Sequence, residues 1–175
     1  MNVFEKIDAR DIVIRHFKTL SNVNTGKLCW SELIVFYVLS AIIIIATVYS
    51  FDHTLTDKLA NLFFQAFAIT GGFFINALVM LTDRRQSYDD SKRFTERVTL
   101  IEETYANTAF GVLVCFLVVL FAGIAVGTDN GDICSSNLCH IWKTLITSIV
   151  YYLAVVFIHT LGMVIKRLDK IFRSI

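Results

Sequence analysis

The chain has 175 residues, of which 55% are hydrophobic, and its formal net charge is +1. Soluble domains are usually about 45–50% apolar, and here the excess lies in long blocks, which predicts an all-α integral membrane protein. A net charge this close to zero provides no overall field that would recruit nucleic acid, so we expect no direct nucleic-acid binding.

Residues 1–29 are predicted to be a cytoplasmic amphipathic segment that contains a helix and a turn at Ser21–Gly26 before the first span. Its apolar face carries Val3, Phe4, Ile7, Ile14 and Phe17, opposite Glu5, Lys6, Asp8 and Arg15. Such a helix is expected to lie on the membrane surface or to dock against a partner protein.

Residues 30–175 are predicted to form a four-span transmembrane domain, packed as a four-helix bundle. A helix needs about 20 apolar residues to cross a bilayer. Four stretches reach that length, at residues 30–51, 59–81, 105–126 and 141–165. The first is longer than the apolar core of a signal peptide, so we expect it to be retained. Apolar residues at helical spacing predict that the third helix begins within the middle loop, 83–104, and the basic tail is expected to continue the fourth helix.

Lys and Arg alternate in number from one connection to the next. The tally is 5, 1, 5, 1 and 4 for the N-terminal segment, the three loops and the tail. Because basic residues stay on the cytoplasmic side, both termini and the middle loop are predicted to be cytoplasmic, in the inner membrane of a bacterium. The basic residues of that loop, predicted to contact anionic lipid headgroups or a partner, are Arg84, Arg85, Lys92, Arg93 and Arg97.

Polar residues inside the spans are the first candidates for function, because they are costly in lipid. The predicted intramembrane stripe consists of Gln65, Asn76, Asn107, Ser148 and His159. Ordinary hydrogen bonding between helices is one interpretation, and a hydrated path or sensing site with His159 as its titratable member is the other. Two small-residue patterns, Asn107-x3-Gly111-x3-Cys115 and Gly123-x3-Gly127, predict close helix packing.

Cys134 and Cys139 lie in the predicted outer loop. Disulfides persist on the exterior of the membrane, so a bridge between them is predicted. Two free thiols, or a metal site that includes His140, are the alternatives.

Enzyme signatures are missing from the sequence, which has no Walker loop, no Gly-x-Ser-x-Gly and no His-Glu-x-x-His. We therefore predict a non-enzymatic protein without a cofactor or a metal site. Arg10 and His16 match the loose Arg-x5-His spacing of HEPN-type nucleases, but that spacing stands alone. Glu102 and Glu103 precede the third span and are expected to complement its helix dipole. Pairing with an arginine of the same loop is the alternative.

These features favour a membrane scaffold or sensor that forms a homo-oligomer and recruits a soluble cytoplasmic protein. The alternative is an oligomeric channel or membrane-depolarising effector, with Gln65, Asn76, Ser148 and His159 around a central path. A membrane enzyme ranks last.

The layout is similar to that of the small four-helix membrane subunit of Kiwa-type bacterial antiphage systems. The resemblance rests on the span count, the chain length, the inward termini and the charged segments 1–29 and 83–104. It implies a homo-oligomer in the inner membrane, bound to a cytoplasmic DNA-binding partner and responding to disturbance of the membrane by phage.

Overall fold

The computed structural model describes residues 9–20, 30–51, 55–86, 95–129 and 137–173, and nearly all of them are helical. The elements are α1 (Ala9–Thr19), α2 (Trp30–Leu33), the π-helical η2 (Ile34–Leu39), α3 (Ser40–Phe51), α4 (Asp57–Gln86), α5 (Thr95–Asp129) and α6 (Asn137–Arg173). No strand occurs within these ranges, so the predicted all-α class is confirmed.

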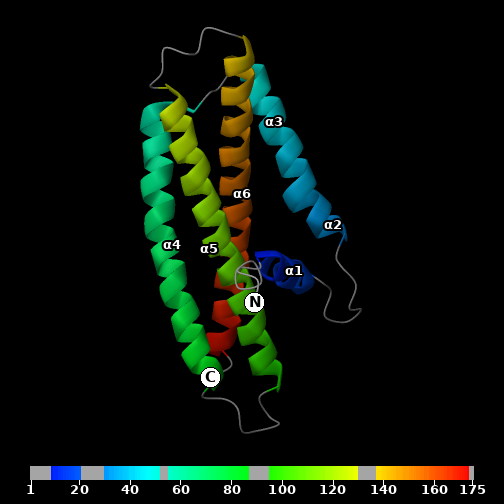
Figure 1. Cartoon of the computed structure of the whole chain (residues 1–175). Coiled ribbons are helices and arrows are strands. Elements are labelled where there is room, and N and C mark those ends of the chain that lie inside the picture. The colour runs from blue at the N-terminus through cyan, green and yellow to red at the C-terminus, as the bar shows by residue number, and fades with distance from the viewer. Residues whose placement is uncertain (1–8, 21–29, 52–54, 87–94, 130–136, 174–175) are drawn as a thin grey trace, which may run out of the picture.

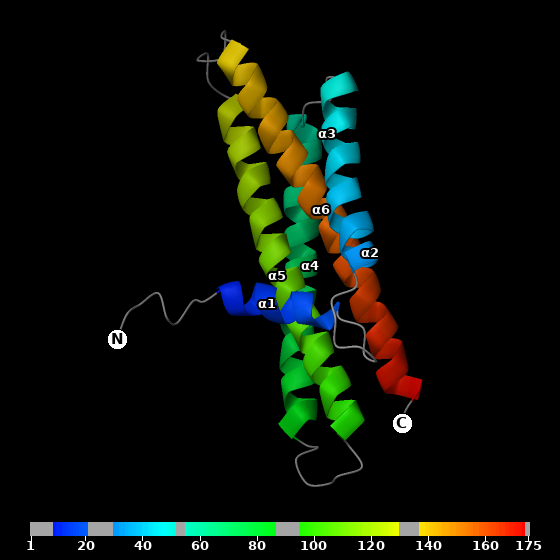
Figure 2. The same ribbon diagram turned by 90° about the vertical axis from the view of Figure 1, so that its right-hand side faces the viewer.

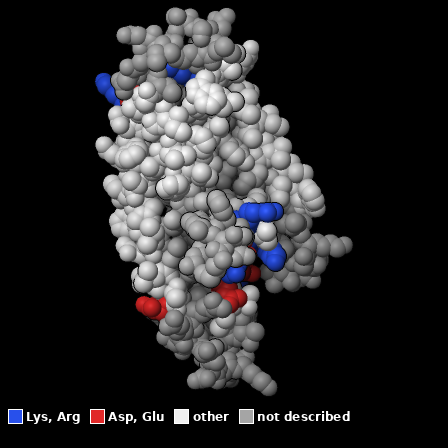
Figure 3. All heavy atoms as spheres, viewed as in Figure 1, with Lys and Arg blue, Asp and Glu red and all other residues white. Residues whose placement is uncertain are grey.

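Three of the helices are long and apolar enough to cross a membrane. Their apolar stretches are Asp57–Asp83, Val98–Gly127 and Ile141–Ile171, with mean hydropathies of 1.8, 2.9 and 2.0. The predicted first span is also helical, as α2, η2 and α3 in succession, but its apolar part, Ile34–Ser50, is shorter than the other three. Figure 3 shows an uncoloured band across the upper middle of this face, with charged side chains above it near the top and others in the lower half, as a lipid-facing belt requires.

Both predicted helix extensions are confirmed. Helix α5 begins at Thr95, inside the predicted middle loop, and α6 continues to Arg173. The 37 residues of α6 span about 55 Å at about 1.5 Å per residue, whereas the hydrocarbon layer is about 30 Å thick. The long helices therefore project beyond the lipid.

Helices α4, α5 and α6 pack around an aromatic core. Phe157 of α6 packs edge to face on Phe67 of α4, with ring centroids 5.1 Å apart, and its centroid lies 5.4 Å from that of Phe74. Gly111 of α5 lies against the Phe74 ring, and a Cβ at this position would collide with it. Gly111 therefore sets how closely α4 approaches α5, which is how small residues act in membrane helix packing.

The remaining elements flank this core. Helix α3 packs on α6 and, among the described elements, contacts neither α4 nor α5 (Figure 1). A groove of about 590 Å³ runs between α3 and α6, lined mainly by apolar side chains. Helix α1 crosses the long helices and packs on α5, toward the end of the bundle where α6 finishes (Figure 2). The four-helix arrangement is thus a three-helix core with α3 at its side.

The buried face of α1 differs from the predicted one. Ile12 and Val13 pack against the core, while His16 and Leu20 are buried. Ile14, expected on the apolar face, is 49% exposed. The prediction was therefore wrong for Ile14, because it left out the histidine that the structure buries, whereas Phe17 is half-buried, with its ring centroid 5.5 Å from that of Tyr37. Val3, Phe4 and Ile7 lie outside the described residues.

Candidate functional site

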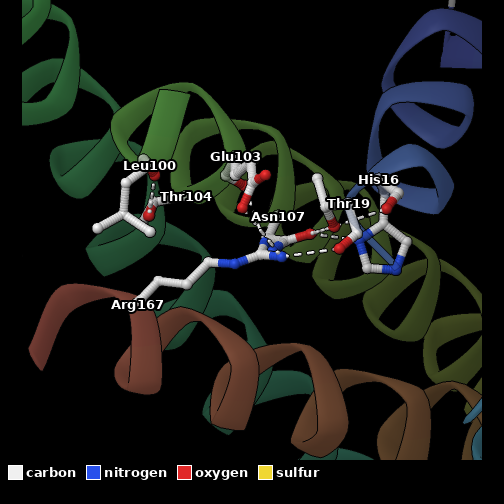
Figure 4. A network of polar contacts seen from close by, with 7 residues as sticks. All are labelled: His16, Thr19, Leu100, Glu103, Thr104, Asn107 and Arg167. Atoms are coloured by element: carbon white, nitrogen blue, oxygen red, sulfur yellow. Dashed lines mark hydrogen bonds and ion pairs between the residues drawn. The ribbon is translucent and has the colours of Figure 1, made fainter. Parts of the chain in front are cut away.

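A group of polar side chains joins α1 to three of the membrane segments. We call it the docking cluster. It consists of His16 and Thr19 from α1, Tyr37 from η2, Glu103 and Asn107 from α5, and Arg167 from α6. Figure 4 shows five of these residues converging from α1, α5 and α6. Residues as far as 148 positions apart in the sequence, Thr19 and Arg167, thus meet at one point.

His16 is the centre of the docking cluster and is fully buried. Its Nδ1 lies 2.7 Å from Oδ1 of Asn107, and its Nε2 lies 2.7 Å from the hydroxyl of Tyr37. Its ring stacks on Phe110, with centroids 3.9 Å apart and planes 7° from parallel. An amide oxygen only accepts, so Nδ1–H donates to Asn107 and the Tyr37 hydroxyl donates to Nε2. Both ring nitrogens of a neutral imidazole are therefore satisfied.

The surroundings of His16 disfavour its protonated form. The pKa of His16 is lowered from 6.5 to about 4, chiefly because burial removes the ring from water; the hydrogen bond to Asn107 acts in the opposite direction, and the positive charge of Arg167 adds to the lowering. A buried imidazolium would lose its hydration without gaining a negative partner in contact. Docked α1 consequently carries a neutral histidine near pH 7.

Asn107 connects α1 to α5. Its Oδ1 accepts from Nδ1 of His16 and also from the hydroxyl of Thr19, at 2.9 Å. Its Nδ2 is buried and has no hydrogen-bond partner among the described residues. An unsatisfied buried donor costs about 1–3 kcal/mol. The two hydrogen bonds that the amide oxygen accepts therefore hold the side chain in this orientation against that cost.

Arg167 closes the docking cluster from α6. Its Nη2 donates to the backbone carbonyl of Thr19 at 2.9 Å, and its Nη1 donates to the carbonyl of Glu103 at 3.3 Å. Nη2 also lies 3.4 Å from a carboxylate oxygen of Glu103. Thr19 is the last residue of α1, so its carbonyl has no partner inside its own helix. Arg167 therefore caps α1 and binds it to α5 and α6 together.

One sequence expectation about this region needs correction. Glu102 and Glu103 were expected at the start of a helix, but α5 begins at Thr95, so both lie beyond the first turn, the part of a helix where a dipole effect acts. Glu103 pairs with Arg167 of α6 and not with an arginine of its own loop, and pairing of Glu102 with a loop arginine stays a prediction. The helix extends further toward the N-terminus than the apolar stretch because polar helical residues continue it in water.

The five residues of the predicted intramembrane stripe are not brought together in one chain. Asn107 is buried in the docking cluster, whereas Gln65 and Asn76 are exposed on α4. Ser148 donates to the carbonyl of Thr144 in its own helix. The ring of His159 lies 4.6 Å from that of Phe36, and its buried Nδ1 has no hydrogen-bond partner among the described residues.

The two small-residue patterns differ in their packing. Asn107, Gly111 and Cys115 are all buried, which confirms the predicted close packing on α5. Gly123 and Gly127 are exposed, and a Cβ at either would meet nothing within 4 Å. Among the described residues, the second pattern therefore has no close packing partner.

Other predicted residues, or their side chains, lie outside the described part of the chain. Cys134, Lys92 and Arg93 fall outside the described residues. Cys139 belongs to α6, Arg84 and Arg85 to α4, and Arg97 to α5, with their side chains not described. The disulfide and the lipid or partner contacts therefore stay predictions. Within the described part of the chain, no group of His, Cys, Asp and Glu is placed to hold a metal ion.

A cleft of about 530 Å³ lies beside the docking cluster, between α1, α4 and α5. Its lining includes the basic side chains of Arg15 and Lys18, the acidic side chains of Glu102 and Glu103, and the ring of Tyr105. This cleft presents both charge signs next to α1.

Sequence reasoning missed His16, Thr19, Tyr37 and Arg167 as members of one site. A signal for the buried face of α1 was present in the sequence. Residues 9, 12, 13, 16 and 20 share one helical face if His16 is counted with the apolar residues. No family model matches the chain, and no curated protein or solved structure matches it either.

Proposed function

We propose that this protein is a non-enzymatic scaffold or sensor of a bacterial inner membrane, which forms a homo-oligomer and recruits a soluble cytoplasmic partner through α1. The observation that carries the proposal is the docking cluster, in which one buried histidine of α1 is bonded to α5 and η2 while Arg167 links the end of α1 to α6.

This arrangement suits a signal that originates in the membrane. A change in the spacing or tilt of α5, α6 or η2 would separate atoms that now lie about 3 Å apart, within the distance range of hydrogen bonds. The π-helical turn that carries Tyr37 is a type of local irregularity often found at functional sites. An isolated helix of 11 residues is marginal in water, so undocking would also loosen the fold of α1.

The outward face of α1 is the surface that a partner would meet. Exposed charged residues, Arg10, Asp11, Arg15 and Lys18, surround the exposed side chain of Ile14. A single apolar side chain within a charged rim is typical of a modest, reversible protein contact. The mixed-charge cleft beside α1 would extend this surface toward α4.

The layout supports a more specific version of the proposal. Similarity to the membrane subunit of Kiwa-type systems favours a role in antiphage defence. In that version the partner is a DNA-binding protein, and this chain itself does not contact nucleic acid.

Co-purification tests the recruiting role. Membranes that carry the chain are solubilised, and bound soluble proteins from the native host are identified by mass spectrometry. Ile14→Ala should reduce capture of a reproducible partner several-fold, because it removes the apolar centre of the contact. Ile42→Ala is the matched control, since Ile42 is also exposed but lies in the apolar α3. Equal capture by both variants would remove α1 as the recruiting surface.

An oligomeric channel is the second candidate, favoured by the outward position of Gln65 and Asn76 on α4. With these amides pointing away from the chain's own core, a conducting path would have to form between copies. Ion flux through reconstituted liposomes without any partner would favour the channel. Stable partner capture without flux would favour the scaffold.

The assumed orientation has its own test. Reporter fusions within residues 83–104 should be active in the cytoplasm, because this loop holds five of the basic residues. Reporters active only on the outer side would overturn both candidate functions, since α1 would then lie outside the cell with the same end of the bundle.

A further inference from the structure

Helix α4 has two opposite faces. Ala60, Phe67, Phe74 and Leu81 recur every seven residues and are all buried against the core. On the other side Gln65, Gly72 and Asn76, spaced by seven and four residues, are exposed. At about 100° per residue the two sets point in nearly opposite directions.

The exposed amides lie at membrane depth. At about 1.5 Å per residue, Gln65 is about 12 Å along the helix from Asp57, and Asn76 is about 10 Å from Asp83, the two ends of the apolar stretch. Their exposed neighbours are large and apolar, namely Leu62, Ile69, Phe73 and Met80. This side of α4 therefore faces hydrocarbon in a single chain.

Lipid tails cannot satisfy these amides. The side chain of neither Gln65 nor Asn76 has a hydrogen bond to another described residue, and each carries two N–H donors and a carbonyl acceptor. Transfer of an amide from water into a solvent without hydrogen-bonding groups is strongly unfavourable. A polar surface in another protein helix would remove this penalty, which is why such residues promote helix association in membranes.

Gly72 lies between the two amides and is open to approach. A Cβ built there meets nothing within 4 Å, so the glycine serves no close contact with any other described residue. Ala68, four residues before it, is also exposed. A second helix could therefore lie close to the α4 backbone at the midpoint between Gln65 and Asn76.

We infer that the face of α4 formed by Gln65, Gly72 and Asn76 is the contact surface between copies of this chain. Copies insert in the same orientation, so their α4 helices run parallel about an axis normal to the membrane and bring equivalent residues to equal depth. A side-chain amide both donates and accepts, so Gln65 and Asn76 can each pair with their own counterpart. A different membrane protein could satisfy this surface only if it carried amides at the membrane depths of both Gln65 and Asn76. The inference rests on the oligomerisation in the proposed function and adds the surface that carries it.

Self-association of purified chains in lipid nanodiscs or liposomes tests this surface, by native mass spectrometry and by energy transfer between labelled copies. The double variant Gln65→Leu with Asn76→Leu keeps side-chain bulk and removes the amides. It should weaken association about tenfold, from two lost bonds of about 0.6 kcal/mol each. Gly72→Leu should weaken association further by separating the helices. Gly162→Leu, at an exposed glycine of α6 with no atom within 4 Å of a built Cβ and outside both small-residue patterns, is the matched control and should associate like the wild type.

The outcomes separate this inference from the proposed function. If the wild type and all the variants form the same oligomer, the α4 surface is wrong and oligomerisation stands. If the wild type is monomeric at every lipid-to-protein ratio, both fail. If the double variant keeps its oligomeric mass but loses ion flux, the amides line a water-filled path between copies, and direct pairing is overturned.

Discussion

Acidification should release α1 from the membrane helices. The pKa of His16 is about 4 in the docked state and 6.5 when the side chain is in water. Because the docked pKa is the lower one, docking is fully favoured above pH 6.5 and is lost as the pH falls from 6.5 toward 4. Undocked α1 takes up a proton at His16 more readily than docked α1, so acidification shifts the docking equilibrium toward the undocked state.

The size of the effect follows from the two pKa values. At pH 7.4 nearly all His16 is neutral in both states, so the contribution is close to zero. At pH 5.0 the undocked histidine is almost fully protonated and the docked one is mostly neutral, which weakens docking about 30-fold, or about 2 kcal/mol. Below pH 4, His16 is protonated in both the docked and the undocked state, so further acidification no longer weakens docking.

Hydrogen exchange of α1 in nanodiscs measures this release. Protection factors of the α1 amides, corrected for the intrinsic pH dependence of exchange, should fall steeply between pH 7.4 and 5.0, while those of the middle of α5 stay constant. His16→Gln replaces the imidazole with an amide that does not titrate and should flatten the response. Glu103 is the member of the docking cluster that carries a carboxyl group, next to Arg167, so Glu103→Gln is run in parallel and should retain the response.

Two results would refute the reasoning. One is wild-type protection that does not change over this pH range, which would mean that protonation of His16 does not oppose docking. The other is an equal pH response in the His16→Gln variant, which would place the titrating group elsewhere.

Two further predictions concern the core and the outer loop. Gly111→Ala should lower the stability of the bundle by about 1–3 kcal/mol, because the added methyl group collides with Phe74. Thermal unfolding in detergent measures the loss. Gly162→Ala, where a Cβ meets nothing within 4 Å, is the control and should show no loss. Cys134 and Cys139 should resist alkylation until a reductant is added, and immediate labelling of both in protein from oxidising growth would contradict the predicted bridge.

The hydrophobic pattern by itself determined the membrane helices. Apolar stretches of about 20 residues predict helices wherever the lipid leaves backbone groups no other partner, and the structure places helices at each of the four. The extension of α5 was also predictable, because Val98, Ile101 and Tyr105 continue the helical spacing beyond the apolar stretch.

Tertiary structure alone decided how α1 is held and which face of α4 remains free. His16, Tyr37, Asn107 and Arg167 come from four different elements, and a local pattern contains no information about which distant side chains will meet. The amphipathic pattern of α1 was ambiguous because histidine counts as polar in water, yet it can be buried when both ring nitrogens find partners. Likewise Asn107 and Asn76 look alike in sequence, and only the packing of α4 on α5 directs one inward and the other outward.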